Sequence, residues 1–394
     1  MPTQASSIKS ADQRSEPVAG AVEFGSQFGL LPRQKIEVMV RRGMIMSPEL
    51  DNGQIQPASL DLRLGPKAYR IRASFLPGKD RTVEGQLANL NSEEISLEGH
   101  GAVLERGCVY VIPLLESLKL PESISAIANP KSSTGRLDIF TRLITDRSEV
   151  FDRAARAYEG PLYAEVSPRS FSIRVRRGTR LNQIRFRRLN SQQLERNDFS
   201  LDEKELRERH EALPLVDGPL NLRNGLVLRV ALSREPLGPI IGYRAQKHAD
   251  ILDVDRVGAY AVSDYWEPIL AREDQRLILD PGEFYILASH EKLHIPPDLA
   301  AEMVPIDPAM GEFRVHYAGF FDPGFGHTVS NLPGARAVLE VRSREVPFIL
   351  ENGQVVGRLV YEKMAEAPLS VYGQLEGAHY QGQGLKLSKH FQEC

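Results

Sequence analysis

Two cations and two hydroxyls that could together bind a phosphate group lie in "NPKSSTGR", residues 129–136: Lys131, Ser132, Ser133 and Arg136. The small residues Thr134 and Gly135 between them would let backbone N–H groups approach an anion closely. The same segment is typical of a solvated turn, because Asn-Pro and Thr-Gly pairs favour turns. Taken alone, it favours the turn, and phosphate binding is a hypothesis for the rest of the chain to support.

Two carboxylates farther along the chain could act on the rest of a nucleotide-like ligand. Asp322 precedes Pro323 and Gly324, so it could accept a hydrogen bond from a sugar hydroxyl or simply form a turn. Glu340 ends the triplet Val338-Leu339-Glu340 inside an apolar strand pattern, where a carboxylate is costly unless it is paired or used. The alternative is an ion pair with Arg344, as its counterpart Glu165 could form with Arg169.

The cysteine count excludes one class of chemistry. The chain has two cysteines, Cys108 and Cys394, and contains no Cys-x-x-Cys, His-Glu-x-x-His or Walker motif, so zinc-dependent deamination is not expected. Two cysteines and a polar N-terminus without an apolar signal core favour a reducing, cytoplasmic location. Residues 1–30 are expected to be a disordered leader, and the chain has no run of 18 apolar residues that could span a membrane.

An internal repeat explains how these side chains could be positioned. Residues 107–186 align with residues 282–361 without a gap, and identical pairs include Gly107 and Gly282, Tyr110 and Tyr285, Glu116 and Glu291, and Glu165 and Glu340. In this alignment Asp307 replaces Ser132, whereas Asp322 is matched by Arg147. Each copy has therefore kept one polar loop and lost the other, which predicts a single site shared by the two copies.

Alternating apolar and polar residues predict that each copy is built from strands. The clearest runs are "CVYVIPL", "FSIRVRR" and "LNQIRFRR" in the first copy, and "EFYILAS", "ARAVLEVRS" and "VVGRLVYEK" in the second. We expect a mainly β chain made of two small barrels or sandwiches, with short helices at "LPRQKIEVMVRRGMI" and "SLDEKELRERHEAL". The predicted parts are a β domain over residues 31–190, a charged helical linker over 191–220, treated as a solvated spacer, and a second β domain over 221–394.

The assembled motifs resemble those of the dCTP deaminases, in the dUTPase-like (β-clip) superfamily of trimeric distorted β-barrels. The resemblance rests on Lys131-Ser-Ser-x-x-Arg136, the Asp322-Pro-Gly turn, the triplet ending at Glu340, the segment "ASLDLRLG" and the tail "VYGQLEGAHYQGQG". The chain is most similar to the long, fused form of the family. It departs from the pattern at His379, where the family usually has lysine.

The resemblance implies the roles of specific residues. Glu340 would be the general base of a zinc-independent hydrolytic deamination of dCTP to dUTP and ammonia, with Ser132 and Arg136 orienting water. The implied substrate-binding residues are Lys131, Ser132, Ser133, Thr134, Gly135, Arg136, Ala318, Asp322, Val338, Leu339, Glu340, Tyr372, His379 and Gln383. The family further implies Mg²⁺ carried by the triphosphate, no protein-bound metal, a tail that covers the nucleotide, a homo-oligomer, and dTTP as an inhibitor.

Three other functions stay open. A dUTP pyrophosphatase, or a bifunctional deaminase and dUTPase, would attack the α-phosphate of the nucleotide. A nucleotide sensor would bind dCTP without turnover. Residues 169–188 hold eight arginines and could bind nucleic acid. Their spacing on alternate strand positions and the net charge of −3 favour a solvated face or pairing between the domains instead.

Overall fold

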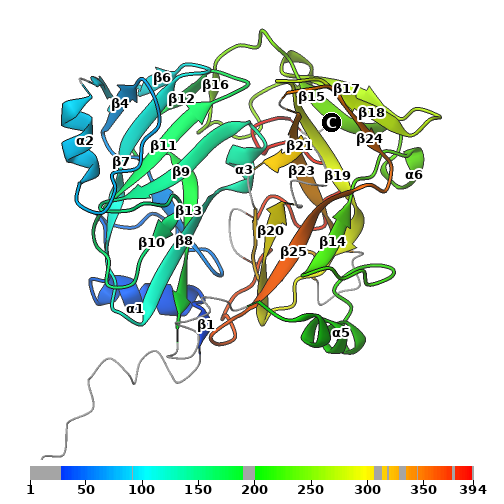
Figure 1. Ribbon diagram of the computed structural model, residues 1–394, viewed down its shortest axis with the longest axis horizontal. Coiled ribbons are helices and arrows are strands. Elements are labelled where there is room, and N and C mark those ends of the chain that lie inside the picture. Colours follow the sequence, from blue (N-terminus) through cyan, green and yellow to red (C-terminus); the bar gives the residue numbers. More distant parts are fainter. Residues whose placement is uncertain are drawn as a thin grey trace, which may run out of the picture.

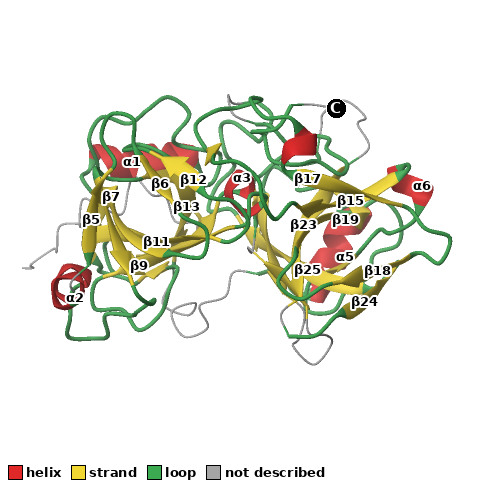
Figure 2. Ribbon diagram, turned by 90° about the horizontal axis from the view of Figure 1, so that it is seen from above, coloured by secondary structure: helices red, strands yellow, loops and turns green. Residues whose placement is uncertain are grey.

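The chain forms two β-rich halves that lie side by side, with the short helix α3 (Ser132–Gly135) between them (Figure 1). The computed structural model describes residues 28–90, 92–189, 200–305, 313–316, 319–327, 334–343, 345–374 and 378–392, and for 313–316 the backbone alone. The view from above shows the same two units meeting at α3 (Figure 2). The predictions for residues 1–27, Asp307, Ala318, Arg344 and Cys394 lie outside the described residues.

The N-terminal half contains two antiparallel sheets. The strands of the first are β1 (Gly29–Leu30), β13 (Arg180–Arg188), β8 (Ile124–Pro130) and β10 (Arg153–Ala154), with β3 (Leu60–Arg63) paired to β13. The strands of the second are β5 (Glu93–Ser96), β4 (Lys67–Ile71), β7 (Val109–Lys119), β11 (Glu159–Pro168) and β9 (Ile139–Thr145), with β2 (Ile45–Met46) paired to β7. Because β1 pairs with β13, residues 29 and 30 belong to this half and not to a leader.

The C-terminal half repeats this arrangement. Its main sheets are β14 (Leu226–Arg229), β25 (Val355–Lys363), β20 (Leu299–Pro305) and β22 (Phe320–Phe321), and β17 (Trp266–Leu270), β15 (Ile240–Ala245), β19 (Phe284–Leu293), β23 (Ala335–Ser343) and β21 (Phe313–His316). Strands β18 (Arg276–Leu279) and β24 (Phe348–Glu351) pair with each other. A three-stranded sheet joins the halves. In it, β12 (Ile173–Val175) pairs with β6 (Ala102–Leu104) of its own half in antiparallel orientation and with β16 (Leu252–Asp253) of the other half in parallel orientation.

The helices are short. Besides α3 they are α1 (Arg33–Arg41), α2 (Val83–Asn89), α5 (Glu203–Ala212), α6 (Arg234–Leu237) and the 3₁₀ turn η1 (Val262–Asp264). Helix α1 buries Ile36 and Met39, and the chain leaves it at Gly43, whose φ of +68° favours glycine. Among the described residues, every helix is too short or too polar to cross a lipid bilayer.

The strand positions confirm a mainly β chain with repeated units. Strands β8 and β20 begin at Ile124 and Leu299, 175 residues apart, and β13 and β25 begin at Arg180 and Val355 with the same spacing. Between these strands, however, the gapless alignment fails. Ala154 pairs with Ala126, and Phe321 pairs with Ala301, the counterpart of Ala126. Phe321 is therefore the structural counterpart of Ala154, although the two residues are not 175 positions apart.

The failure of the gapless alignment changes the counterpart of one site residue. Asp322 follows Phe321 as Ala155 follows Ala154, so Asp322 corresponds to Ala155 and not to Arg147. The turn itself survives in both halves, because Ala157 (φ +55°) and Gly324 (φ +91°) adopt the same left-handed backbone. The N-terminal half therefore kept the turn and lost its carboxylate.

The predicted linker is not a solvated spacer. Leu206 of α5 is 1% exposed and packs in the core of the C-terminal half, together with Leu201, Leu215 and Val216. The helix begins after Asp202, which forms a capping box with Glu205, two residues beyond Ser200 and Glu203, the pair that the sequence predicts. The C-terminal half therefore begins near residue 200, and residues 190–199 lie outside the described residues.

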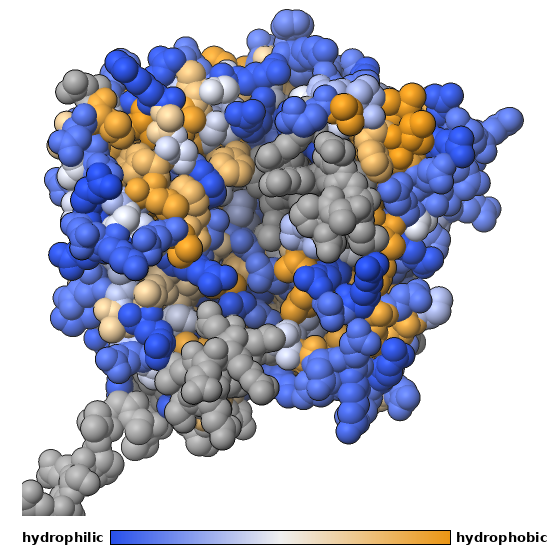
Figure 3. Space-filling view, viewed as in Figure 1, coloured by the Kyte–Doolittle hydropathy of each residue, from blue (hydrophilic) through white to orange (hydrophobic). Residues whose placement is uncertain are grey.

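Three arginines of the arginine-rich segment form ion pairs between the halves. Arg187 pairs with Glu362, Arg176 pairs with Asp253 at 2.6 Å, and Arg185 pairs with Asp322 at 2.8 Å. Arg185 is fully buried, so it faces the other half rather than solvent. Exposed faces of both halves are mainly hydrophilic, and the molecule is hollowed where the halves meet (Figure 3). Three of the eight arginines thus serve the interface between the halves, whereas Arg177 and Arg180 pair with Glu98 and Asp51 of their own half. These pairings favour a structural role over nucleic-acid binding.

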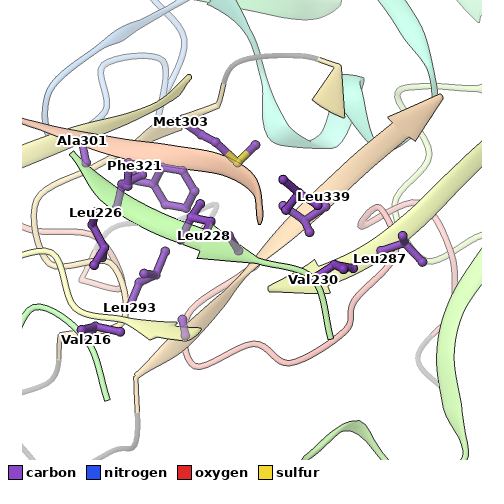
Figure 4. Close-up of a cluster of buried hydrophobic side chains, with 14 of the residues drawn as sticks. Val216, Leu226, Leu228, Val230, Leu287, Leu293, Ala301, Met303, Phe321 and Leu339 are labelled. Atoms are coloured by element: carbon purple, nitrogen blue, oxygen red, sulfur yellow. The ribbon is translucent and has the colours of Figure 1, made fainter. Parts of the chain in front are cut away.

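Apolar cores fill both halves and extend across the junction. The C-terminal core includes Leu228, Leu293, Phe321 and Leu339 (Figure 4). A second cluster is shared, because Phe171 of the N-terminal half lies edge-on to Trp266 of the C-terminal half, with ring centroids 5.6 Å apart. The shared core fixes the orientation of the two halves and therefore of any site between them.

Candidate active site

A cavity of about 480 Å³ lies between the two halves. One wall comes from residues 130–139 and from β13, and the other from β22, β23 and residues 372–390. The cavity therefore joins the two polar loops that the sequence predicted to share one site, and it does so within a single chain.

Residues 131–136 form a rigid corner of this cavity. The N–H of Lys131 donates to the carbonyl of Leu181 in β13 at 2.9 Å, and Thr134 Oγ1 donates to the same oxygen at 2.9 Å. The hydroxyl-bearing Ser132 and Ser133 line the cavity. Strand β13 thus anchors the loop, and the turn predicted from composition is also a wall of the site.

Lys131, the first of the two cations in this loop, forms an ion pair. Lys131 Nζ forms an ion pair with Oδ2 of Asp61, a residue of β3 that is 1% exposed and lines the cavity. The other oxygen, Asp61 Oδ1, is buried and has no hydrogen-bond partner among the described residues. A buried carboxylate oxygen without a donor is costly, and a cation in the cavity would satisfy it.

Glu340 faces this loop from the opposite half. Its side chain is 5% exposed, and a Cβ added to Gly135 would lie 2.7 and 2.8 Å from its two carboxylate oxygens. Burial raises the pKa of the Glu340 carboxyl well above its usual value, and repulsion by Asp138 adds to this, whereas attraction by Arg136 opposes it. A carboxylate with a raised pKa is a stronger base than a free one, as a group that accepts and then donates a proton requires.

The corresponding glutamate of the N-terminal half is neutralised instead. Glu165 opposes Arg142 of β9, as Glu340 opposes His316 of β21 in the same register. Arg142 Nη2 lies 2.6 Å from the Glu165 carboxylate, so the expected pairing with Arg169 is wrong. In the described part of the chain no side chain donates a hydrogen bond to Glu340. The repeat therefore kept two glutamates but left one of them available for chemistry.

Arg136 is held by the C-terminal tail. Its Nη1 donates to the Lys386 carbonyl at 2.9 Å, its Nη2 donates to Gln383 Oε1 at 3.0 Å, and its guanidinium carbon lies 3.9 Å from the ring centroid of Tyr380. Gln383 Nε2 in turn donates to the Arg336 carbonyl at 2.9 Å. The tail thus closes over the loop and aligns the positive charge of Arg136 toward Glu340.

Asp322 is both a turn residue and a site residue. Its carbonyl accepts from the N–H of Phe325 at 3.1 Å, and its Oδ1 accepts from Arg185 Nη2 at 2.8 Å. Burial raises the pKa of the Asp322 carboxyl, and the charge of Arg185 opposes that rise. The Asp322 carboxylate lines the cavity, with the charges of Asp61 and Lys131 close enough to act on it, so it can accept from a ligand hydroxyl.

Two tail residues complete this side of the cavity. Tyr372 lies over the Asp-Pro-Gly turn, with its N–H donating to the Pro323 carbonyl at 2.8 Å and its Oη accepting from the N–H of Tyr380 at 3.1 Å. Burial lowers the pKa of His379, and the charges of Lys389 and Lys386 lower it further. His379 is therefore neutral at pH 7 and offers an anion a weaker contact than a lysine would.

Most of the predicted site residues line this one cavity: Lys131, Ser132, Ser133, Thr134, Arg136, Asp322, Val338, Glu340, Tyr372, His379 and Gln383. Two do not. The side chain of Leu339 points to the opposite face of β23, into the C-terminal core (Figure 4), and Gly135 lies behind the Glu340 carboxylate. Ala318 lies outside the described residues.

Sequence reasoning missed several other lining residues, which include Asp61, Arg180, Gln183, Lys389 and His390, whereas Tyr380 belongs to the tail motif already named. Asp61 had a signal, because it interrupts the apolar alternation of "ASLDLRLG". Lys389 and His390 follow the recognised tail motif and had none. They reach the cavity because the last turn of the chain folds back between the two halves.

Two domain families match the chain. Residues 27–190 match "2'-deoxycytidine 5'-triphosphate deaminase (DCD) N-terminal domain", and residues 202–391 match "2'-deoxycytidine 5'-triphosphate deaminase (DCD), C-terminal domain". The chain is also similar to the crystal structure of 2'-deoxycytidine 5'-triphosphate deaminase from Agrobacterium tumefaciens, with 53% identity, a TM-score of 0.80, and coverage of 86% of this chain and 99% of that one.

Shorter relatives match part of the chain. It is 32% identical over 135 residues to "dCTP deaminase, dUMP-forming" of Beutenbergia cavernae, which covers 32% of this chain and 66% of the relative. It is 32% identical over 151 residues to "dCTP deaminase" of Haloarcula marismortui, covering 36% of this chain and 71% of the relative. A match to a dUMP-forming protein of Pseudarthrobacter chlorophenolicus at 32% identity spans 28% of this chain and 56% of the relative, less than two thirds of its length.

Proposed function

Since the chain belongs to the dCTP deaminase family, we propose that it hydrolyses dCTP to dUTP and ammonia at the cavity between its two halves. The observation that carries the proposal is the position of Glu340. A buried carboxyl with a raised pKa lies against the 131–136 loop of the other half, in the same cavity that Lys131 and Asp322 line. That arrangement suits proton transfer at the base of a bound nucleotide.

Glu340 carries the protons in this mechanism. It takes a proton from water as the oxygen adds to C4 of cytosine, and it delivers that proton to N3. It then takes the remaining hydroxyl proton and passes it to the amino group, which leaves as ammonia while the C4 carbonyl forms. The atoms balance as cytosine plus water giving uracil plus ammonia, and the carboxylate is regenerated.

Ser132 and Arg136 assist this step. The hydroxyl can orient the water, and the guanidinium, fixed by Gln383 and Tyr380, favours negative charge on the tetrahedral intermediate. Losing one such preorganised donor typically costs about two to three orders of magnitude in rate. Both groups come from the N-terminal half, so neither half alone could carry out the reaction.

The two ends of the nucleotide have distinct contacts in this proposal. The 131–136 loop binds the triphosphate, and Asp322, with Tyr372 packed on its turn, accepts from the deoxyribose 3'-hydroxyl. Mg²⁺ arrives with the triphosphate, where it neutralises charge. The unpartnered Asp61 Oδ1 fits a contact with that ion. In the described ranges no cluster of three His, Cys, Asp or Glu side chains forms a metal site of its own.

The proposal extends to four further properties that the family resemblance implies. They are a dUTPase-like distorted barrel in each half, a homo-oligomer, inhibition by dTTP, and a cytoplasmic location. The repeated sheets of the two halves support the barrels. The product needs its own test, because some relatives carry the name dUMP-forming.

Product analysis tests the function. The purified chain is incubated with each deoxynucleoside triphosphate and Mg²⁺ while ammonia and pyrophosphate are measured. We expect ammonia and dUTP from dCTP, without pyrophosphate. Release of dUMP and pyrophosphate along with ammonia would indicate a bifunctional enzyme, pyrophosphate from dUTP alone a dUTPase, and tight dCTP binding without product a sensor.

A further inference from the structure

Besides Arg136, which the tail holds, three neighbouring cations line the cavity: Lys131, Arg180 and Lys389. Lys131 is paired with Asp61, and Arg180 Nη2 lies 2.8 Å from Asp51. Lys389 differs from the other two, because within the described residues its ammonium has neither a hydrogen bond nor an ion pair. It is the cation in this group whose charge is left for a ligand.

The backbone around Lys389 is firmly held. On one side Ser388 Oγ donates to the carbonyl of Ser133 at 2.8 Å, and on the other His390 Nε2 lies 2.8 Å from the Val254 carbonyl. The N–H of Lys389 itself donates to Tyr380 Oη at 3.2 Å. These contacts tie the residue directly to the 131–136 loop, so its side chain enters the cavity from a fixed base and not from a loose chain end.

The charges around Lys389 indicate what it would bind. Burial lowers the pKa of the Lys389 ammonium, and repulsion from Lys131 and Arg180 lowers it further, whereas Asp61 and Asp255 oppose this. Two histidines of the tail, His379 and His390, also line the cavity, and burial lowers the pKa of both, that of His390 to about 4. An excess of buried positive charge is unfavourable without an anion and becomes favourable when an anion enters.

We propose that Lys389 binds the anionic oxygens of the nucleotide triphosphate, in place of the cation that is missing at residue 379. The inference rests on the proposed function and names a binding residue outside the tail motif. Because Ser388 joins the same turn to Ser133, the contact also holds the end of the chain closed over the loop. Lys389 thereby favours a triphosphate over ligands with fewer phosphate groups.

The test compares Lys389→Met with the wild type and with Lys389→Arg. Loss of a charge-assisted contact should raise KM for dCTP about 10- to 100-fold with kcat changed by less than about threefold, because the contact is equal in ground and transition states. The affinity for inorganic tripolyphosphate, measured by calorimetry, should fall by a similar factor. Lys389→Arg should restore both values, and Lys247→Met, which removes an exposed cation paired with Glu283, should change neither.

The outcomes separate this inference from the proposed function. Unchanged KM and unchanged tripolyphosphate affinity in Lys389→Met would overturn it, as would a fall in kcat alone, which would mean that Lys389 only shapes the tail. A fall in affinity that is equal for tripolyphosphate and for dCMP would also overturn it. If the wild type releases no ammonia from dCTP, the proposed function fails, but the calorimetric comparison still decides the role of Lys389.

Discussion

At the scale of single residues, Gly135 of one half leaves room for the Glu340 carboxylate of the other. The φ of Gly135 is not positive, so alanine is acceptable to the backbone there, and the three atoms nearest the added methyl would all belong to the Glu340 carboxyl group. A flexible carboxylate can move aside, but it then leaves its position over the site. Gly135 is therefore needed for the position of the Glu340 carboxylate and not for the stability of the fold.

We therefore predict that Gly135→Ala loses activity without losing stability. The rate of ammonia release from dCTP should fall at least about 10-fold, because a displacement near 1 Å of a catalytic group is costly. The midpoint of thermal unfolding should change little. Gly99→Ala, at an exposed turn with φ +59° and open space around it, provides the opposite control, since it should cost stability but not activity. Normal turnover by Gly135→Ala would contradict the placement of Glu340.

The buried Glu340 also predicts a pH-dependent stability difference. Burial raises the pKa of Glu340 in the folded chain, so as the pH rises above about 4.5 the unfolded chain releases a proton that the folded chain keeps. Stability contributed by this residue is therefore present at low pH and is lost as the pH rises through the folded pKa. Glutamine at this position cannot ionise and avoids that loss.

Glu340→Gln should accordingly release no measurable ammonia, still bind dCTP, and resist urea better than the wild type at pH 8 but not at pH 4.5. Each unit of pKa shift corresponds to about 1.4 kcal/mol. The matched control is Glu165→Gln, which breaks an ion pair with Arg142 and should lower stability at pH 8. An equal stability difference at both pH values would show that the pKa of Glu340 is not raised in the folded chain. Ammonia release near the wild-type rate would show that Glu340 is not the general base.

At the scale of elements, the C-terminal tail connects the site to the shared core. Phe391 packs on Trp266, with ring centroids 5.9 Å apart, and its neighbours in the chain supply the contacts to Ser133 and Arg136. Packing of Phe391 on Trp266 thus anchors the tail segment that contacts Ser133 and Arg136. Trp266 is the one tryptophan in the sequence, so its fluorescence reports on that anchor alone.

Phe391→Ala should detach the tail while leaving both halves folded. Truncating a buried phenylalanine costs about 3–5 kcal/mol when the whole fold must respond, and detachment of a chain end limits that cost. We expect a red shift of Trp266 emission together with a drop of about 10-fold or more in kcat/KM for dCTP. Phe75→Ala, in a separate cluster of the N-terminal half, should leave both readouts unchanged. A detached tail with full activity would disprove its role in positioning Arg136.

At the scale of the whole molecule, the pair Arg185–Asp322 couples the halves. Arg185 donates to Asp322 and to the carbonyls of Phe321 and Ala301, and it is fully buried. Removing one partner of a buried pair leaves an uncompensated charge, which typically costs about 3–5 kcal/mol. The same contact positions the proposed sugar-binding carboxylate, so stability and activity depend on it in different ways.

Arg185→Met should lower the free energy of unfolding by about that amount, measured in urea. Adding Asp322→Asn should recover part of the stability, because no unpaired carboxylate then remains, while dCTP turnover stays low. If the double variant Arg185→Met, Asp322→Asn regained activity as well as stability, Asp322 would not be a substrate contact. Equal stability of Arg185→Met and the wild type would mean that the interface does not depend on this pair.

Much of this organisation followed from local sequence alone. The alternation of strands such as β13 and β25 predicted the sheets, since a strand with one buried face must alternate with period two. Short motifs that bind a ligand through neighbouring residues, namely 131–136 and the Asp322 turn, were also readable, because their chemistry lies within a few positions of the chain. Helix α1 followed from its apolar face and its glycine end.

The tertiary structure decided what depends on contacts between distant residues. From the sequence one could not tell that Arg142 neutralises Glu165 while the Glu340 carboxylate lies against Gly135, because a strand pattern does not specify cross-strand partners. The sequence pattern also placed α5 in a solvated spacer, although Leu206 packs in the core, and it matched Asp322 with Arg147 instead of Ala155. Insertions that cancel in length are invisible to a gapless alignment but not to strand pairing. Lys389 reaches the cavity only because the last turn folds between the two halves, and no local pattern encodes a contact across more than 250 residues.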